Sequence, residues 1–256
     1  MSLTLSLHRL ATALGLAALL AAPAAFAAQQ PAPGNVDAVL HQLDAASARF
    51  KSLEANIRID LFERVVQDTS TECGLIYYQR QGTAIQMDLR SASAAANACP
   101  SSAFSAPPSR VINYSKGTLK MFEPQANHLT LINAGSNQAT YESFLTLGFG
   151  ASGHDLAKAW NITDEGTETL NDGAKNVSTV KLKLVAKDPA ILKNVTSVVI
   201  WIDPTRGISL KQQFTTPAGD SKTTYFTDIR YNQKIDKLET ASFSIKTNSQ
   251  TQIDRH

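Results

Sequence analysis

The stretch "SVVIWIDPTRGISLKQQFTTPAGDSKTTYFTDIRYN", residues 197–232, decides the fold. It contains three runs rich in apolar and β-branched residues, and the segments between them carry Pro, Gly and Asp, which favour turns. Strands joined by such short turns must be antiparallel, because a parallel return requires a long crossover. The stretch contains no cluster of residues typical of a catalytic site. It therefore predicts an antiparallel sheet without chemistry of its own.

The alternation of apolar and polar residues that marks a half-buried strand also occurs upstream. Ile57, Ile59 and Leu61 alternate with Arg58 and Asp60, as a strand with one buried face requires. Further strands are predicted at 73–80, 83–90, 110–115, 118–123, 128–132 and, after Trp160, at 178–188, with a last strand at "FSIK", residues 243–246. One chain thus carries roughly ten short strands.

Three segments have the periodicity of helices. Apolar residues recur at helical spacing over 36–53, and two shorter helices are predicted at 140–150 and 152–160, the latter with Ser152 as N-cap and Asp155 three residues on. A meandering sheet of this length must curl strongly or close. We expect an α+β, mainly β fold. Its single antiparallel sheet, of about ten or eleven strands, curls into an incomplete barrel with the N-terminal and central helices as a lid over a hydrophobic cavity.

The N-terminus has the features of an export signal. His8 and Arg9 precede the apolar run "LATALGLAALLAA", and Ala25 and Ala27 supply small residues for cleavage after Ala27. The alternative is a retained membrane anchor, but Pro23 interrupts the run before it reaches the roughly 20 residues of a spanning helix. We therefore expect residues 1–27 to be a signal peptide.

The rest of the chain, residues 28–256, is predicted to form a single domain. Once Arg9 is removed, basic residues outnumber acidic ones by about one, with His counted as neutral. Such a balance offers no electrostatic footprint for nucleic acid. No segment has the composition of a domain linker.

Two cysteines, Cys73 and Cys99, lie in this domain. In an exported protein an even pair favours a disulfide over a metal site, and two free thiols are the alternative. Cys99 lies in the small-residue-rich segment 91–109, which has the character of an inserted loop. A bridge to Cys73 would tether that loop.

Motifs for catalysis or cofactor binding are weak. "GFGASG", residues 148–153, matches the dinucleotide-binding fingerprint formally, but it does not follow a strand, and three glycines more simply provide a break between helices. The sequence has no Gly-x-Ser-x-Gly motif, and its histidines are isolated, so an exported hydrolase lacks a nucleophile and a base. We expect no enzymatic activity, no cofactor and no metal. A curled sheet lined by apolar side chains can itself bind an apolar ligand.

The chain resembles the family of periplasmic outer-membrane lipoprotein carriers of the LolA and LolB type. Four segments carry the resemblance, and their order and spacing matter more than any one of them: "VDAVLHQLDAASARFKSLEANIRIDLFERV", "VINYSKGTLKMFEPQANHLTLIN" with Gly117 and Phe122-Glu123-Pro124, "YESFLTLGFG", and "WIDPTRGISLKQQFTTPAGDSKTTYFTDIRYNQKIDKLETASFSI" with Asp203-Pro204, Gly207 and Phe243. The likeness covers nearly the whole of residues 28–256.

The resemblance implies a monomeric carrier in the periplasm. It would receive acylated lipoproteins, or a related lipid, from an inner-membrane exporter and deliver them to an outer-membrane receptor. The alternative is a periplasmic sensor or protein-interaction module of the same half-barrel architecture that transports nothing. The family also has an arginine after its second strand that bonds the lid when the cavity is empty. Arg80 lies at the matching place, although Gln81 replaces the usual proline, so a plain surface arginine is the alternative.

The predicted cavity is lined by one face of the strands and by the lid. The candidates on the strands are Ile57, Ile59, Leu61, Leu75, Met87, Leu89, Leu119, Met121, Leu182, Ile200 and Ile202, and those on the lid are Phe144, Leu145, Leu147 and Phe149. The sequence does not fix which strand face points inward, because a one-residue slip in register reverses every assignment.

Overall fold

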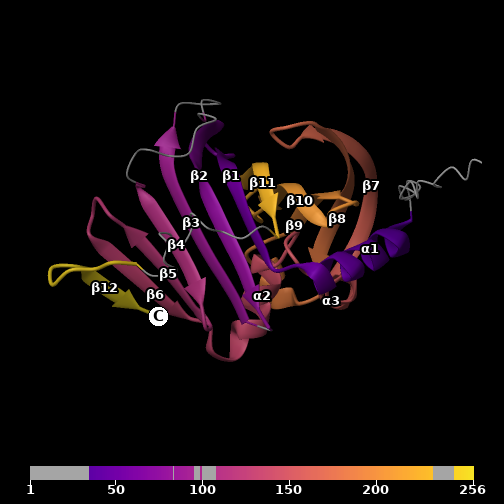
Figure 1. Ribbon diagram of the computed structural model, residues 1–256. Helices are drawn as coiled ribbons and strands as arrows, with labels where there is room; N and C mark the ends of the chain where they lie inside the picture. The colour runs from indigo at the N-terminus through magenta and orange to yellow at the C-terminus, as the bar shows by residue number, and fades with distance from the viewer. Residues whose placement is uncertain (1–34, 83, 95–98, 100–107, 233–244) are drawn as a thin grey trace, which may run out of the picture.

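A computed structural model describes residues 35–82, 84–94, 99, 108–232 and 245–256. Its centre is one sheet of twelve strands in the order β12-β6-β5-β4-β3-β2-β1-β11-β10-β9-β8-β7. The sheet is open and strongly curled, so that β4–β6 form one wall and β7–β9 the other (Figure 1). The mainly β, incomplete-barrel architecture predicted from the sequence is confirmed.

The strands follow one another mostly as antiparallel neighbours, with β1 paired to both β2 and β11 in the middle of the sheet. Their bounds are β1 Ser52–Glu63, β2 Asp68–Gln81, β3 Ala84–Ala94, β4 Arg110–Ser115, β5 Thr118–Glu123, β6 His128–Asn133, β7 Trp160–Asn171, β8 Asn176–Ala186, β9 Ser197–Asp203, β10 Ile208–Thr215, β11 Ser221–Tyr231 and β12 Gln252–Arg255. The short turns between consecutive strands explain this pattern. Only β12, paired to β6, is parallel among the described strands.

The helices have the bounds α1 Val36–Arg49, α2 Gln138–Leu145, α3 Gly153–Ala159 and α4 Pro189–Leu192, with a 3₁₀ turn at Gly135–Asn137 before α2. Asn35 caps α1, since its side chain accepts a hydrogen bond from the Ala38 amide at 3.0 Å. Ser152 caps α3 in the same way from Asp155, as predicted. In Figure 1, α1 and α3 lie together below β7 and β8, while α2 lies below β11.

One face of the sheet, called here the inner face, is mainly apolar. The pairings Met87 with Tyr78, Ile57 with Phe226, and Leu182 with Ile200 place all these side chains on this face. Residues directly opposite one another in paired strands point to the same side, so the pairings extend a single face from wall to wall.

The core of the protein lies on this inner face in two clusters. One is built on β1–β4 and includes Tyr78 and Phe149, whereas the other joins α1 and α3 to β7–β9 and includes Leu43 and Trp160. Burial of these aliphatic and aromatic side chains stabilises the curled sheet by about 25 cal/mol for each Å² of apolar surface removed from water. Helices α1 and α3 are therefore an integral part of the core.

The structure also corrects several sequence predictions. Helix α1 ends at Arg49 rather than continuing to Leu53, and Phe50 and Leu53 instead pack in the core. Strands β7 and β12 were not predicted, and the sheet has twelve strands rather than ten or eleven. Of the strand predicted at "FSIK", Phe243 and Ser244 lie outside the described residues, and Ile245 and Lys246 do not form a strand.

The predicted disulfide between Cys73 and Cys99 is confirmed, with their Cα atoms 5.5 Å apart. It attaches the segment before β4 to the middle of β2. Most of the inserted segment 91–109 lies outside the described residues, as does the predicted signal peptide. Within the described part of the chain, no helix has the length and apolar character needed to cross a membrane.

Candidate functional site

The candidate site is the contact between the inner face and the segment that includes α2 and residues 146–151, called here the lid. Phe149 inserts its ring against Phe226 of β11, with ring centroids 4.7 Å apart in an edge-to-face arrangement. The same ring lies 6.4 Å from that of Tyr78 on β2. Phe149 also forms an isolated backbone bridge with Ile208. The lid thus closes directly on the middle of the sheet.

The local sequence explains how the lid approaches so closely. Gly148 and Gly150 have φ angles of 74° and 80°, a left-handed conformation that favours glycine. A Cβ atom at Gly148 would lie 2.3 Å from the Cβ of Ser209, and one at Gly150 would lie 2.7 Å from the Phe50 ring. The glycines of "GFGASG" therefore allow the turn that inserts Phe149, rather than binding a dinucleotide.

A second aromatic contact holds the other end of the lid. The ring of Phe144 meets that of Trp160 edge-to-face at 5.4 Å, and the ring of Phe214 lies at 6.5 Å. Between the two aromatic anchors, the side-chain amide of Gln212 donates a hydrogen bond to the carbonyl of Leu147. This bond satisfies a lid carbonyl that would otherwise be buried among apolar side chains.

Helix α2 is also bonded to the wall formed by β4. The hydroxyl of Tyr114 donates to Glu142 Oε1 at 2.8 Å, and Gln138 donates to the same oxygen at 2.8 Å. Burial raises the pKa of Tyr114, and its hydrogen bond to Glu142 adds to the effect. The tyrosine therefore remains a neutral donor at neutral pH.

Arg80, near the end of β2, connects the sheet, α1 and the lid. Its Nη1 donates to the Ser47 carbonyl at 3.2 Å, in the last turn of α1, and its Nη2 donates to the Gly150 carbonyl at 2.5 Å. The hydroxyl of Ser47 donates to the same Gly150 oxygen at 2.6 Å. The guanidinium also lies 5.6 Å from the Phe50 ring centroid. We call Arg80 with Ser47 and Gly150 the latch.

A hollow of about 710 Å³ opens beside the latch. Its lining combines lid, sheet and α3, with Arg80, Ile85, Thr146, Leu156 and Trp160 among the residues that form it. The hollow thus borders the contact between the lid and the sheet.

The structure places the predicted cavity residues as follows. The inner face holds Ile57, Ile59, Leu61, Met87, Leu89, Leu119, Met121, Leu182, Ile200 and Ile202. Leu147 and Phe149 are buried in the core, and Phe144 and Leu145 pack against it. Leu75 lies on the opposite face: Ile57 pairs with Gly74, and Leu75 is opposite Asn56.

Sequence reasoning missed several residues that form the inner face beside the lid. These are Phe50, Tyr78, Ile85, Tyr114, Gln212 and Phe226. Continuing the alternation along β11 could have identified Phe226, whereas the run "CGLIYY" in β2 is apolar throughout and does not reveal the face of Tyr78. Nothing local in the sequence signals Gln212, because a glutamine on a strand is usually exposed.

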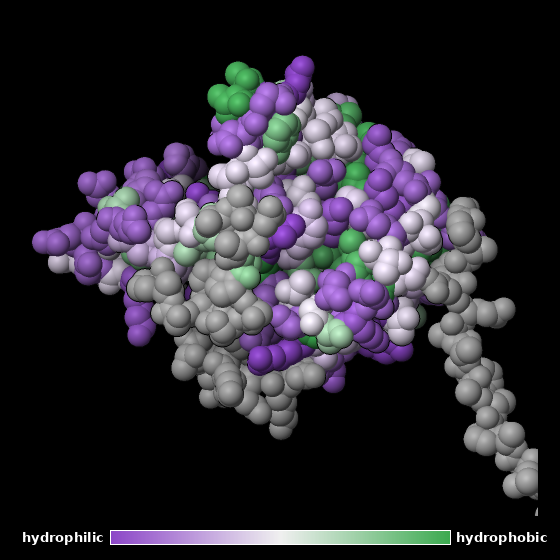
Figure 2. All heavy atoms as spheres, turned by 90° about the horizontal axis from the view of Figure 1, so that it is seen from above, coloured by the Kyte–Doolittle hydropathy of each residue, from purple (hydrophilic) through white to green (hydrophobic). Residues whose placement is uncertain are grey.

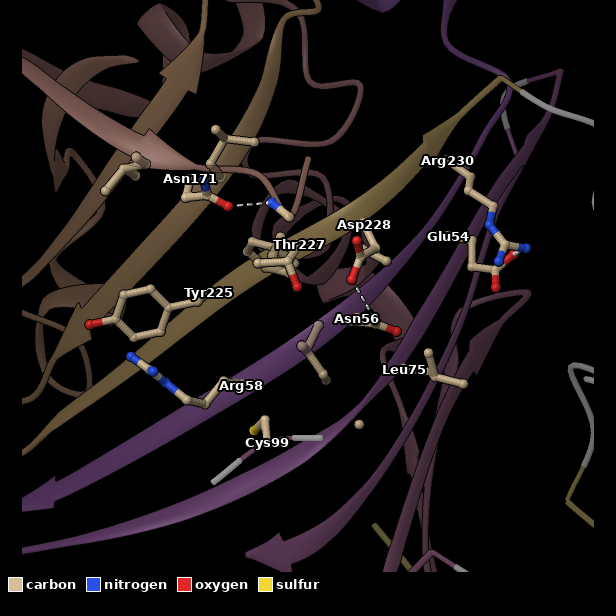
Figure 3. A pocket seen from close by; sticks show the side chains of 17 residues that line it. Glu54, Asn56, Arg58, Leu75, Cys99, Asn171, Tyr225, Thr227, Asp228 and Arg230 are labelled. Carbon is tan, nitrogen blue, oxygen red and sulfur yellow. Dashed lines mark hydrogen bonds and ion pairs between the residues drawn. The ribbon is translucent and has the colours of Figure 1, made fainter. Parts of the chain in front are cut away.

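The outer face carries a second hollow of about 770 Å³, shown in Figure 3. Arg58 and Tyr225 lie together on one side of it, with the guanidinium 4.1 Å from the ring centroid. On the other side the Asn56 amide donates to Asp228 at 2.7 Å. Leu75 also lines this hollow. Among its charged residues, Arg230 pairs with Glu54 and Arg58 pairs with Asp60 of β1, which favours a structural role.

The described residues contain no group of three or more His, Cys, Asp or Glu side chains that could hold a metal ion. The surface seen from above in Figure 2 is mostly hydrophilic and carries only small, scattered hydrophobic areas. Among the described residues, the exposed large hydrophobic side chains are Val65, Val66 and Ile253.

Several solved structures are similar to this chain in fold. MucB is 15% identical with a TM-score of 0.46 over 87% of this chain and 67% of that chain. A putative outer membrane lipoprotein-sorting protein domain from Vibrio parahaemolyticus is 12% identical with a TM-score of 0.40 over 82% and 99%. The LolA superfamily protein NE2245 from Nitrosomonas europaea is 10% identical with a TM-score of 0.36 over 81% and 97%.

Neither a family model nor a curated protein sequence matches the chain. LolA superfamily proteins, whose likeness was noted on the sequence, are thus among the solved structures similar to this chain. At these identities and TM-scores, the likeness assigns no activity, ligand or partner to it.

Proposed function

We propose that this protein binds the acyl chains of a lipoprotein, or of a related lipid, between the inner face and the lid, and carries them through the periplasm. The observation that supports this proposal is the latch. Arg80 holds the Gly150 carbonyl and the end of α1 together over a contact that is mainly apolar, with further hydrogen bonds to the lid from Gln212 and Tyr114. A polar fastening over an apolar interface can open without breaking a covalent or metal bond.

The energetics favour exchange of the lid for a ligand. Opening removes Phe149 and Leu145 from the inner face and exposes the apolar surface that they cover. An acyl chain that occupies the same surface recovers about 0.8 kcal/mol for each buried methylene. A chain of about a dozen carbons can therefore compensate for the lost lid contacts without any polar recognition.

In this proposal the structure represents the closed, empty state. Binding and release would follow the balance between lid closure and acyl-chain binding, since a ligand shifts a conformational equilibrium by its differential affinity for the two states. An inner-membrane exporter would supply the cargo and an outer-membrane receptor would accept it.

The test is saturable binding of an apolar fluorescent probe, N-phenyl-1-naphthylamine, by the protein without its signal peptide. We expect about one site per chain and displacement of the probe by dodecanol. Leu145→Glu should weaken binding, because it places an unpaired charge against the acyl chain. Leu145→Met, of similar volume and apolar character, should bind as the parent does.

A closed core without a ligand site would give a different result. The parent would show no saturable binding, and Leu145→Glu would only lower the free energy of unfolding. That outcome would remove the carrier proposal and favour the sensor or interaction module.

A further inference from the structure

Three charged side chains meet on the inner face, at the end of the sheet distant from the latch. Glu72 of β2 is paired with Ile59, and Lys222 of β11 is paired with Leu61, so both point to the inner face. Arg110, the first residue of β4, is two residues before the inner-face residue Ile112. We call Glu72, Arg110 and Lys222 the charged mouth.

Hydrogen bonds fix the position of the carboxylate in this mouth. Glu72 Oε1 accepts from Arg110 Nη1 at 2.8 Å, and Glu72 Oε2 accepts from the buried Ser91 hydroxyl at 2.7 Å. The side chain of Glu72 is 11% exposed, whereas that of Arg110 is 42% exposed. Glu72 therefore positions Arg110 and leaves much of the guanidinium open to solvent.

Lys222 supplies a second cation without a fixed partner. Among the described residues, its amine has no hydrogen bond or ion pair, and the residue is exposed to solvent. Although solvent reaches the residue, Lys222 lies on the concave inner face, where the surrounding protein lowers the pKa of its amine by desolvation, an effect that Glu72 opposes and Arg110 increases. With one carboxylate and two cations, the mouth has an excess positive charge when Lys222 is protonated.

Apolar side chains continue from the mouth along the inner face. Leu61 lies opposite Lys222, Ile112 follows Arg110, and Met121 is paired with Ile112. All three are only partly buried, unlike Ile57 and Ile59. The mouth and this apolar strip together present a cationic end and a hydrophobic path, which is the complement of an anionic amphiphile.

We propose that Arg110 and Lys222 bind the anionic headgroup, a phosphate or carboxylate, of a ligand whose acyl chain lies along the inner face. This inference rests on the proposed acyl-chain binding and adds the chemical class of the headgroup. Arg110 contributes a planar donor pair suited to either anion, and Lys222 contributes a mobile point charge.

The test compares four ligands with the same twelve-carbon chain: dodecanoate, dodecyl phosphate, dodecanol and dodecyltrimethylammonium. Each displaces N-phenyl-1-naphthylamine from the protein at low salt, near pH 7 and below the concentration at which it forms micelles. We expect at least one anion to bind about tenfold more tightly than dodecanol, and the cation to bind more weakly than dodecanol. The tighter anion identifies the headgroup as phosphate or carboxylate.

Variants locate the effect. Lys222→Gln should reduce the preference for the anion, and Lys222→Gln with Arg110→Gln should abolish it, while the affinity for dodecanol stays unchanged. Lys222→Arg should keep the preference. Lys183→Gln, on the outer face of β8, is the matched control and should behave as the parent does.

The two proposals fail in different ways. Equal binding of anions and dodecanol by the parent, or a preference that survives in the double variant, overturns the headgroup site and leaves acyl-chain binding intact. Displacement by none of the four ligands overturns acyl-chain binding and the headgroup site with it.

Discussion

The Nη2 atom of Arg80 lies 2.5 Å from the carbonyl oxygen of Gly150, so a strand of the sheet donates directly to the turn that inserts Phe149. The bond has a reason in the local backbone. Gly150 adopts a left-handed conformation, and the same carbonyl also accepts the Ser47 hydroxyl. One oxygen atom therefore links the sheet, α1 and the lid.

Replacing the latch arginine should open the lid. Arg80→Leu removes the donors to Ser47 and Gly150 and leaves the Gly150 carbonyl with the Ser47 hydroxyl as its only remaining side-chain donor in the described chain. We expect the free energy that favours the closed lid to fall by about 1–3 kcal/mol, and amide hydrogen exchange over residues 146–151 to become faster. Transfer of a bound acyl probe to acceptor vesicles should also be impaired, because an open cavity retains its ligand.

The control for this prediction is Arg49→Leu. Arg49 is an exposed arginine in the last turn of α1 with no side-chain hydrogen bond or ion pair to the described residues. It should leave exchange and transfer unchanged. If Arg80→Leu behaves like Arg49→Leu, Arg80 is a surface charge and not a latch.

The turn that inserts Phe149 should not tolerate a side chain at Gly150. Gly150→Ala combines a positive φ with a Cβ atom 2.7 Å from the Phe50 ring. The backbone strain alone amounts to about 1–2 kcal/mol, and the steric clash adds to it. We expect a lower free energy of unfolding and weaker protection of the Phe149 amide from exchange.

Gly135→Ala separates the two effects. Gly135 also has a positive φ, of 49°, but a Cβ atom there would meet nothing within 4 Å. It should show the backbone effect without the clash, so its loss of stability should be the smaller of the two. Equal losses would mean that the lid does not press on Phe50 in solution.

The Cys73–Cys99 disulfide should stabilise the fold through the unfolded chain. It closes a loop with a sequence separation of 26, for which the chain-entropy model predicts about 3 kcal/mol. The pair of substitutions Cys73→Ala and Cys99→Ala should lower the free energy of unfolding by about this amount in urea. Reducing the parent protein should have a similar effect, and labelling of unfolded, unreduced parent should find no free thiol.

The sequence predicts a strand and its buried face where apolar and polar side chains alternate. It does not do so where only backbone pairing with a neighbouring strand fixes the face. The alternation around Ile57 and Ile59 identifies a strand and its buried set because one face is apolar and the other polar. In β2 the run "CGLIYY" is apolar throughout, so alternation does not reveal its face, and Leu75 was assigned to the wrong one. The register with β1, which only the structure shows, decides it.

The two unpredicted strands lack an apolar signal for a similar reason. β7, "WNITDEGTETLN", is an edge strand with an irregularity between Asp164 and Thr167, and its residues are mostly polar. β12, "QIDR", is held by backbone pairing with β6, more than a hundred residues away in sequence.

The charged mouth was missed because Glu72, Arg110 and Lys222 are brought together by non-local strand pairings. Arg80 was found through the family resemblance and not through any local pattern.

The buried tyrosine under the lid should make stability fall in alkaline solution. Burial raises the pKa of Tyr78 above its ordinary value of 10, an effect that Arg80 opposes and that Glu142 and Tyr114 reinforce. A raised pKa in the folded state means that the neutral form contributes stability fully below pH 10. That contribution is lost as the pH rises above 10 towards the folded-state pKa, because the unfolded chain loses the proton first.

Tyr78→Phe removes this proton equilibrium, and it also removes a buried hydroxyl that has no hydrogen-bond partner in the described structure. We therefore expect Tyr78→Phe to be neutral or slightly stabilising at pH 7 and to lose less stability than the parent between pH 9 and pH 11, as measured by urea unfolding. Tyr141→Phe, at a partly buried tyrosine of α2, is the control and should follow the parent. Parallel curves for the parent and Tyr78→Phe would show that the ring is accessible to water, and hence that the lid is open in solution.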